Sequence, residues 1–333
     1  MADDCLEKVI HGGKGKGRQE KTHKQVLDFS ASLNPFPPRI SWHCNPEDLG
    51  RYPDDSYCEL KEVIARSYNR DPAEVCVGNG SIELIRVFCS VVFRNKKDGK
   101  FFAASPTFGE YALSARLAGA STTKHESEAD VHFVCNPNNP TGLLYSKETM
   151  LEFLAGTRSE ALLFCDEAFI DLSDPRQSLS AIRDSRLFVL QSLTKSFAVP
   201  GLRFGFGFAD PALAEKIEIA RPPWSVNAYA EAFARAAIPH RKDVEQSRQL
   251  IEQERQWLTE ELSVLGFSPC PSMANYVLFR YSKDVGPLCE KLAESDILVR
   301  DCSSFGLSDC IRVAVRTRDE NRTLVEVIRS CVL

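Results

Sequence analysis

The chain of 333 residues is long enough for two domains, or for one large domain with a smaller companion. Its 43% hydrophobic and 26% charged residues are typical of a soluble globular protein, and the net charge of −5 disfavours a nucleic-acid-binding protein, which usually presents a basic face to phosphates. No apolar stretch reaches membrane-spanning length, and the N-terminus lacks the apolar segment of a secretion signal, so we expect a cytoplasmic protein without a membrane partner.

The cysteines of the chain are numerous but scattered. The sequence contains twelve of them, with no C-x-x-C or H-x-x-H pair. Several, such as Cys135 and Cys165, lie inside apolar runs, where cysteine behaves as a small hydrophobic residue. We therefore expect reduced thiols, no bound metal and no framework of disulfides.

The first 40 residues are rich in Gly, Lys and Pro, with GGKGKG at residues 12–17. This run superficially resembles a phosphate-binding loop. However, no strand pattern precedes it and no helical pattern follows closely, so the nucleotide signature is weak. The composition favours a mobile arm.

From about residue 55 helical and strand-like segments alternate. ELKEVIARSYN predicts an amphipathic helix with Leu60, Val63, Ile64 and Tyr68 on one face, and a short strand, a Gly-Asn-Gly turn and a helix from Ser81 follow. Five later runs are apolar on both faces of a strand: KFFAAS, DVHFVCN, ALLFCDE, RLFVLQS and RFGFGFA. Such runs, separated by helical stretches, predict a mostly parallel sheet covered by helices.

The C-terminal third has a different pattern. A long helical segment over residues 245–266 predicts a connector into a second domain. It is followed by a strand, a helix, two strands and a final helix from about Asp319, which is typical of a small α+β domain. We thus expect an N-terminal arm over residues 1–40, a large domain over 41–235 and a small domain over 236–333.

Three of the apolar runs end in polar residues of different kinds. Asn139 follows one run, Asp166 ends another and Lys195 follows the third. Ligands of open α/β sheets bind at the carboxyl ends of the strands, so we expect these side chains to meet in one crevice. GNGS at residues 78–81 adds a helix N-terminus that can accept a phosphate. Each feature alone is usually a turn, a cap or an exposed side chain, and only their joint occurrence indicates a site.

Pyridoxal phosphate is the cofactor that needs this combination. Lys195 would supply the amine for a Schiff base, and Asp166 would keep the pyridine nitrogen protonated so that the ring can accept electrons. Asn139 suits the ring oxygen, and Phe108 in SPTFGEY suits stacking on the ring. The residues that suit the cofactor phosphate are Gly80, Ser81, Ser192, Thr194 and Arg203.

The chain resembles the fold-type I pyridoxal-phosphate enzymes of the aminotransferase class I/II superfamily. The matching motifs run in family order over most of the chain: GNGSIEL, SPTFGEY, NPNNPTG, DEAFIDL, SLTKSFAVPGLRFGF and CIRVAVRT. The resemblance implies a large α/β/α domain with a mostly parallel sheet, a small α+β domain, and covalent attachment of the cofactor to Lys195. It also implies that Arg203 holds the cofactor phosphate and that Arg312 holds the substrate carboxylate with a bidentate fork.

A further implication of the resemblance concerns the oligomer. Tyr52, in RYPDDSY, resembles the tyrosine that reaches the phosphate of the cofactor in the neighbouring subunit. The resemblance therefore implies an obligate homodimer with shared active sites.

Two branches of the superfamily are most similar to this chain, the histidinol-phosphate aminotransferases and the L-threonine-O-3-phosphate decarboxylases of cobalamin synthesis. HGG at residues 11–13 before LDFSASLNP, the ILVRDC motif with Arg300, and IRVAVRTRDENRTL resemble the decarboxylase branch. Phe169 in DEAFIDL also favours it, since many aminotransferases have there a tyrosine that donates to the ring oxygen. Ser32 departs from this branch, which often has an asparagine at that position.

A phosphorylated amino acid requires one clamp for its carboxylate and one for its phosphate. By resemblance Arg300, Arg312 and Asn139 would serve the carboxylate end, while His11 and Asn34 would close over the phosphate. Without the resemblance, His11 is interpreted as a residue of a flexible arm and Arg300 as a surface residue.

We therefore expect decarboxylation of L-threonine O-3-phosphate to (R)-1-aminopropan-2-yl phosphate. An aminotransferase acting on histidinol phosphate or a related amine remains an alternative, because Lys195 and Asp166 serve both reactions. A non-catalytic regulator on the same fold is the alternative of another class.

Overall fold

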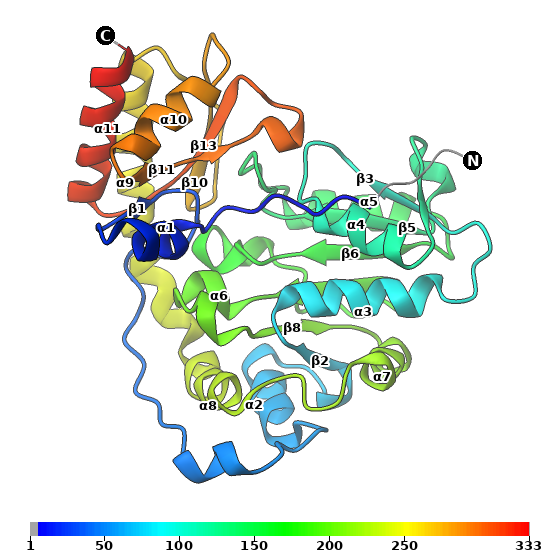
Figure 1. Cartoon of the computed structure of the whole chain (residues 1–333). Helices are drawn as coiled ribbons and strands as arrows, with labels where there is room; N and C mark the ends of the chain where they lie inside the picture. The colour runs from blue at the N-terminus through cyan, green and yellow to red at the C-terminus, as the bar shows by residue number, and fades with distance from the viewer. Residues whose placement is uncertain (1–5, 333) are drawn as a thin grey trace.

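The computed structural model describes residues 6–332 (Figure 1). The larger part of the molecule is built around a seven-stranded sheet. Its strand order is β2-β8-β7-β6-β5-β3-β4. The strands are β2 Val75–Gly78, β3 Lys100–Ala103, β4 Ser121–Thr122, β5 Val131–Cys135, β6 Leu162–Asp166, β7 Leu187–Gln191 and β8 Gly205–Phe208. Only β8 runs antiparallel to its neighbours, β2 and β7, so the prediction of a mostly parallel sheet is confirmed.

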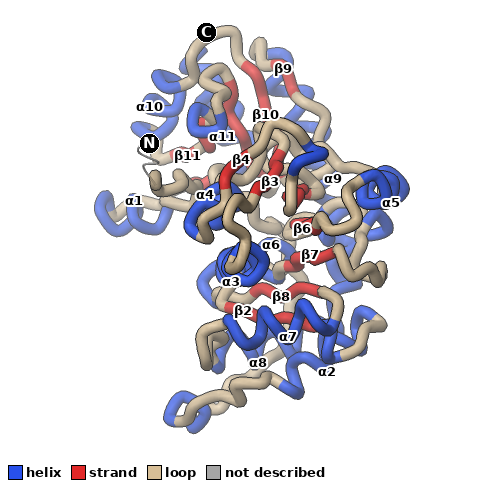
Figure 2. Tube along the Cα trace, turned by 90° about the vertical axis from the view of Figure 1, so that its right-hand side faces the viewer, coloured by secondary structure: helices blue, strands red, loops and turns tan. Residues whose placement is uncertain are grey.

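Helices cover both faces of this large sheet, and Figure 2 shows α3 and α5 on opposite sides of the strands. One face packs against α2 Cys58–Tyr68, α5 Lys147–Gly156 and α8 Ala228–Ala237, and the other against α3 Ser81–Phe93, α4 Glu110–Leu117 and α7 Pro211–Ala220. Along β7, Leu187 and Val189 belong to the first core, whereas Phe188 and Leu190 belong to the second. Because both faces are buried, the strands are apolar throughout instead of alternating with polar residues.

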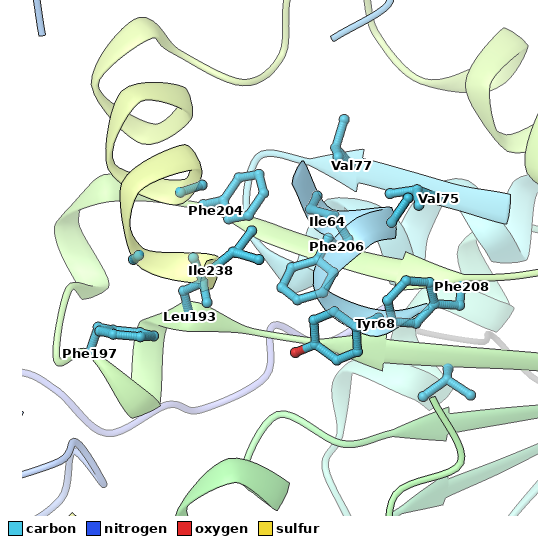
Figure 3. Packing of buried hydrophobic residues seen from close by; sticks show 14 of the residues in the cluster. Ile64, Tyr68, Val75, Val77, Leu193, Phe197, Phe204, Phe206, Phe208 and Ile238 are labelled. Carbon is cyan, nitrogen blue, oxygen red and sulfur yellow. The ribbon is translucent and has the colours of Figure 1, made fainter. Parts of the chain in front are cut away.

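The first of these cores holds the strands at the reversed end of the sheet (Figure 3). Tyr68 of α2 lies between two aromatic residues of β8, with its ring centroid 5.5 Å from that of Phe206 and 4.9 Å from that of Phe208. The predicted apolar face of this helix is largely confirmed, since Leu60, Ile64 and Tyr68 are buried. This packing fixes the edge of the sheet that carries the Gly-Asn-Gly turn.

A small four-stranded antiparallel sheet and three helices make up most of the C-terminal part. The strands are β9 Ser268–Pro269, β10 Tyr276–Arg280, β12 Arg300–Asp301 and β13 Cys310–Ala314, and the helices are α9 Glu245–Val264, α10 Gly286–Glu294 and α11 Arg318–Val332. β1 Leu27–Asp28 pairs in parallel with β11 Ile297–Leu298, so the N-terminal segment joins this part of the molecule. The division of the chain at residues 40 and 235 stays a prediction.

Alternation along β13 decides which side chains face the large sheet. Ile311 and Val313 pack into the core beneath α9, α10 and α11. Because neighbouring strand residues point to opposite faces, Arg312 points away from these helices. The register places Arg300 of β12 directly opposite Arg312.

The N-terminal segment contains a helix that the sequence did not suggest. We expected no helix close to GGKGKG, and this is wrong, since α1 spans Gly15–Thr22. The residue before it, Lys14, makes no side-chain cap. Instead the Gly15 N–H donates to Asp28 Oδ2 of β1 at 2.8 Å. The helix start is thus capped by a residue of a later strand, and the sequence around Gly15 contains no capping residue.

The remaining elements are short. They are α6 Leu193–Ser196 and the 3₁₀ turns η1 Pro46–Gly50, η2 Pro72–Glu74, η3 Glu126–Glu128, η4 Ile170–Leu172, η5 Pro175–Gln177, η6 Pro200–Leu202, η7 Ile238–Val244 and η8 Ser303–Phe305. Within residues 6–332, none of the helices combines the length and the apolarity needed to cross a bilayer. The same residues contain no cluster of three or more His, Cys, Asp or Glu side chains suited to a metal ion.

Candidate active site

A cavity of about 1270 Å³ lies between the carboxyl ends of the central strands of the large sheet and the face of the small sheet that carries Arg312. It is lined by twelve of the residues singled out from the sequence: His11, Ser81, Phe108, Asn139, Asp166, Phe169, Ser192, Thr194, Lys195, Arg203, Arg300 and Arg312. The strand ends therefore converge as expected, although these residues span nearly the whole chain.

Lys195 lies in α6, immediately after β7. Ser192 begins this short helix by accepting a hydrogen bond from the Thr194 N–H at 3.3 Å, which turns the chain so that Lys195 enters the cavity. Among the described residues no carboxylate lies within ion-pair distance of Lys195 Nζ, and the ring centroid of Phe169 is 5.6 Å from it. Burial and, to a smaller extent, the charges of Arg312 and Arg203 together lower the pKa of Lys195 to about 8, against the opposing effect of Asp166.

This pKa predicts how the apoprotein captures pyridoxal phosphate. Only the unprotonated amine attacks an aldehyde, and a pKa lowered to about 8 brings this form into the neutral range. The capture rate should rise about ten-fold per pH unit below pH 8 and level off above it. Stopped-flow absorbance across pH 6 to 10 measures this rate, and a profile still rising steeply at pH 10 would contradict the lowered pKa.

Asp166 ends β6 and has two donors. The Tyr111 hydroxyl donates to its Oδ2 at 2.7 Å and the Ala168 N–H donates to its Oδ1 at 2.9 Å. Burial raises the pKa of Asp166, while both hydrogen bonds and the charge of Lys195 oppose this rise. Because the carboxylate is buried, a cationic ring nitrogen beside it would favour its charged form.

Tyr111 is a site residue that the sequence reasoning missed. It lies in the first turn of α4, three residues after Phe108, which precedes the helix, and the centroids of the two rings are 5.5 Å apart. The signal was present in SPTFGEY, but only the tertiary structure brings the hydroxyl to Asp166.

Tyr111→Phe should weaken the site without unfolding the protein. Removal of the hydroxyl leaves a buried carboxylate short of one donor, which we expect to lower kcat and cofactor affinity by about ten-fold each. Tyr57→Phe is the matched control, because the buried Tyr57 hydroxyl donates to Val226 O at 3.1 Å and Tyr57 does not line the cavity. Equal effects of the two substitutions, measured by kinetics and cofactor titration, would contradict the assignment.

Gly80 and Arg203 meet at the N-terminus of α3. Gly80 has φ +77°, a conformation that other residues rarely adopt, and a Cβ atom there would press against the guanidinium of Arg203. Gly80 itself does not line the cavity, whereas Ser81 and Arg203 do. The backbone at this helix start and the guanidinium form a cradle suited to a phosphate.

Arg300 and Arg312 place two buried guanidinium groups side by side. Their exposed fractions are 7% and 6%, and neither forms an ion pair with a carboxylate in the described part of the chain. Burial lowers the pKa of both residues. Like charges directly opposite each other destabilise a sheet, so this arrangement indicates a binding site for anions.

The partners of Arg312 orient the neighbouring amide. Its Nη1 donates to Asn139 Oδ1 and its Nη2 donates to Ser30 O at 2.9 Å. Since arginine only donates, the amide oxygen of Asn139 is the atom that faces it, which leaves the Asn139 NH₂ group as a donor for another acceptor. This suits the role expected for Asn139 beside a ring oxygen.

Asn34 and Ser32, in the segment that follows β1, lie differently toward the cavity. We expected Asn34 to contact the substrate, but it does not line the cavity: its Nδ2 donates to Ser196 O at 2.8 Å and its Oδ1 accepts from the Phe36 N–H at 2.9 Å. Asn34 thus braces the helix of Lys195. Ser32 does line the cavity, is 2% exposed, and its Oγ has no partner among the described residues.

Arg316 lies at the cavity, whereas Tyr52 lies away from it. Arg316 lines the cavity and was not singled out from the sequence; it donates to Glu320 Oε1 at 2.6 Å and to Asp28 O at 3.2 Å. Tyr52 is 80% exposed and packs against Trp224, with ring centroids 4.4 Å apart and ring planes tilted by 31°, away from the cavity of its own chain. Its expected role toward a partner subunit stays a prediction.

The donor set fits pyridoxal phosphate. An unpaired buried amine, a buried carboxylate with oriented donors, the Phe108 ring and the phosphate cradle all border one cavity. The Lys195 amine would bond to the cofactor aldehyde, and the Asp166 carboxylate would lie at the ring nitrogen. The cradle of Ser81 and Arg203 would hold the phosphate.

Comparison with known proteins agrees with this geometry. Residues 121–328 match the family model described as aminotransferase class I and II. A provisionally named threonine-phosphate decarboxylase of Caldanaerobacter subterraneus subsp. tengcongensis is 33% identical over 328 residues, covering 90% of this chain and 88% of the relative. A histidinol-phosphate aminotransferase of Methylobacillus flagellatus is 30% identical over 302 residues, covering 85% of this chain and 81% of the relative.

A solved structure of a related protein has the same fold as this chain. The histidinol-phosphate aminotransferase of Sinorhizobium meliloti, in complex with pyridoxal-5'-phosphate, superposes with a TM-score of 0.85 at 19% identity, covering 98% of this chain and 96% of that one. The chain therefore belongs to the aminotransferase class I and II family, with the fold-type I architecture and pyridoxal phosphate as its cofactor.

Proposed function

We propose that the protein decarboxylates L-threonine O-3-phosphate to (R)-1-aminopropan-2-yl phosphate, a step that serves cobalamin synthesis. The observation that carries the proposal is the pair of buried guanidinium groups of Arg300 and Arg312 in one cavity, neither paired with a carboxylate of residues 6–332. A substrate with both a carboxylate and a phosphate supplies two anions to this cavity. The similarity to a provisionally named threonine-phosphate decarboxylase supports the same choice.

The residues of the chain bind and orient such a substrate. Arg312 is braced by Asn139 and Ser30 and would hold the carboxylate, while Arg300 lies beside it across β12 and β13. The Ser32 hydroxyl, buried between the segments that brace Arg312 and Lys195, is a further donor for an anionic oxygen. Buried charged donors of this kind lose less strength to solvent than surface ones.

The reaction breaks the bond between Cα and the carboxylate carbon, releases carbon dioxide and places a proton on Cα. Pyridoxal phosphate, when bound, withdraws the electron pair of the broken bond through its protonated ring. Asp166 would stabilise that protonated ring nitrogen, and Tyr111 keeps the carboxylate in place. Lys195, whose pKa is lowered to about 8, can hold the proton at Nζ and deliver it to Cα.

A product assay tests the proposal against transamination. The holoenzyme should release carbon dioxide from threonine phosphate without a 2-oxo acid. Formation of glutamate that depends on 2-oxoglutarate, with no carbon dioxide, would favour the alternative of a histidinol-phosphate type aminotransferase, which the 30% identical relative from Methylobacillus supports. Serine phosphate belongs in the same assay, because a pocket discriminates one methyl group only weakly.

A non-catalytic role is the alternative of another class. The unpaired Lys195 amine and the oriented Asp166 carboxylate count against it, since a regulator has no need for either. Absence of both carbon dioxide and glutamate with every phosphorylated amine, by a holoenzyme that binds the cofactor, would favour it.

We also infer a homodimer in which Tyr52 acts on the partner's site. The 80% exposure of Tyr52 and its contact with the half-exposed Trp224 suit a surface that a second copy covers. Mixing Tyr52→Phe and Lys195→Ala protomers tests this arrangement, because a shared site predicts that mixed dimers regain activity in one of their two sites.

A further inference from the structure

Residues 7–13, which we call the strap, run along the cavity from α1 toward α4 (Figure 1). On the side of the small sheet, Arg300 Nη2 donates to Ile10 O at 2.8 Å, and the Gly13 N–H donates to Ser30 Oγ at 2.8 Å. On the side of the large sheet, Val9 packs so closely on Gly109 that a Cβ there would lie 3.2 Å from Val9 Cγ1. The strap therefore contacts both parts of the molecule across the cavity.

On the side of the large sheet, the strap also makes a polar contact with Glu110 of α4. His11 Nε2 lies 2.9 Å from Glu110 Oε1, and Arg86 Nη2 of α3 donates to Glu110 Oε2 at 3.0 Å. Glu110 is only 5% exposed, so its carboxylate depends on these two partners. A carboxylate accepts but does not donate, so the hydrogen atom of this contact is on His11 Nε2.

This contact fixes the orientation of the His11 ring. The ring centroid of His11 is 5.8 Å from that of Phe108, the residue suited to stacking on the cofactor. With Nε2 donating to Glu110, only Nδ1 of His11 is left for a ligand, and Nδ1 has no hydrogen-bond partner in the described part of the chain. Nδ1 donates to an anionic oxygen when the ring carries a hydrogen on both nitrogens, the form that the Glu110 carboxylate favours. Glu110 and Arg86 do not line the cavity themselves.

We propose that Glu110, held by Arg86, is the positioning residue that seats the strap and orients His11 toward the anionic end of the substrate. The role of the substrate anion rests on the proposed function, whereas the seating of the strap does not. Three elements, the strap, α3 and α4, contribute one group each, so the arrangement exists only when the strap is closed over the cavity.

Hydrogen exchange of the holoenzyme without substrate tests the seating. Glu110→Ala and His11→Ala should each speed exchange of the backbone amides in a peptide covering residues 6–13 by about ten-fold, the effect of losing one hydrogen bond to a charged group. The double variant should exchange no faster than either single variant, because the two residues act through one contact. Exchange in β6 and β7 should not change, which separates a local effect from unfolding.

The control is Asp243→Asn, which removes the carboxylate partner of the exposed His240, 2.9 Å away, and should leave the strap unchanged. Strap exchange that is unaltered in both single variants, or additive effects in the double variant, would overturn the proposal. Glu110→Asp should restore part of the protection that Glu110→Ala removes, because it keeps the charge.

Steady-state kinetics then test the orientation of His11. Glu110→Ala should raise KM for threonine phosphate by about ten-fold with little change in kcat, as expected when binding alone is lost. An unchanged KM would overturn this part of the proposal. If the strap exchanges faster while no variant or wild-type protein consumes threonine phosphate, the proposed function fails and the seating of the strap stands.

Discussion

Lys195→Ala is expected to abolish turnover, with kcat lowered by more than about 10³-fold. The substitution removes both the amine that anchors the cofactor and the group placed to move a proton at the substrate Cα, and proton transfer alone contributes about 10²- to 10⁴-fold. The absorbance band that the cofactor acquires on bonding to the lysine should also be missing. Activity assays and visible spectra of the purified protein measure both effects.

The controls for this substitution separate chemistry from folding. Lys216→Ala removes an exposed lysine of α7 and should leave activity and spectrum unchanged. Far-UV circular dichroism should not distinguish Lys195→Ala from wild type, because Lys195 makes no ion pair in residues 6–332. A visible band that persists unchanged in Lys195→Ala would show that another residue anchors the cofactor.

Arg312→Lys is expected to lower kcat/KM for threonine phosphate by about 10²-fold. Lysine keeps the positive charge but loses the planar fork that binds a carboxylate through two parallel hydrogen bonds. It also gives up the contacts to Asn139 Oδ1 and Ser30 O that orient the site. Most of the loss should fall on KM, while kcat falls to the extent that the Cα–carboxylate bond is misaligned with the ring.

Arg280→Lys is the matched control, because Arg280 lies at the end of the neighbouring strand β10, is exposed, and pairs with Asp309 at 3.2 Å. It should change kcat/KM by less than about two-fold. If Arg312→Lys behaved like Arg280→Lys, the carboxylate would bind elsewhere in the cavity.

The large sheet and the cofactor residues could be predicted because their signals are local. Strands buried on both faces are apolar throughout, and each of the three polar residues Asn139, Asp166 and Lys195 follows or ends such a strand. Parallel strands bring their carboxyl ends to one edge, so proximity follows from topology alone. The structure adds that Lys195 stands on a short helix and that Tyr111 donates to Asp166.

The N-terminal segment could not be predicted in the same way. The start of α1 depends on Asp28, which accepts a hydrogen bond from the Gly15 N–H thirteen residues earlier. The side-chain amide of Asn34 bonds to main-chain atoms of Ser196 and Phe36. The contact of His11 with Glu110 joins residues 99 positions apart. Hydrogen bonds of this kind involve polar side chains whose partners have no periodic spacing, so no sequence pattern reports them.

The sequence by itself determined the mostly parallel sheet, the family and the cofactor, because apolar periodicity and closely spaced motifs are properties of short segments. The tertiary structure decided which charges stand together. It placed Arg300 opposite Arg312, with no carboxylate of residues 6–332 paired to either, drew the strap across the cavity to Glu110, and left Asn34 outside the cavity lining. The physical reason is that desolvation and charge pairing depend on distances between remote segments, and these distances exist only after the chain has folded.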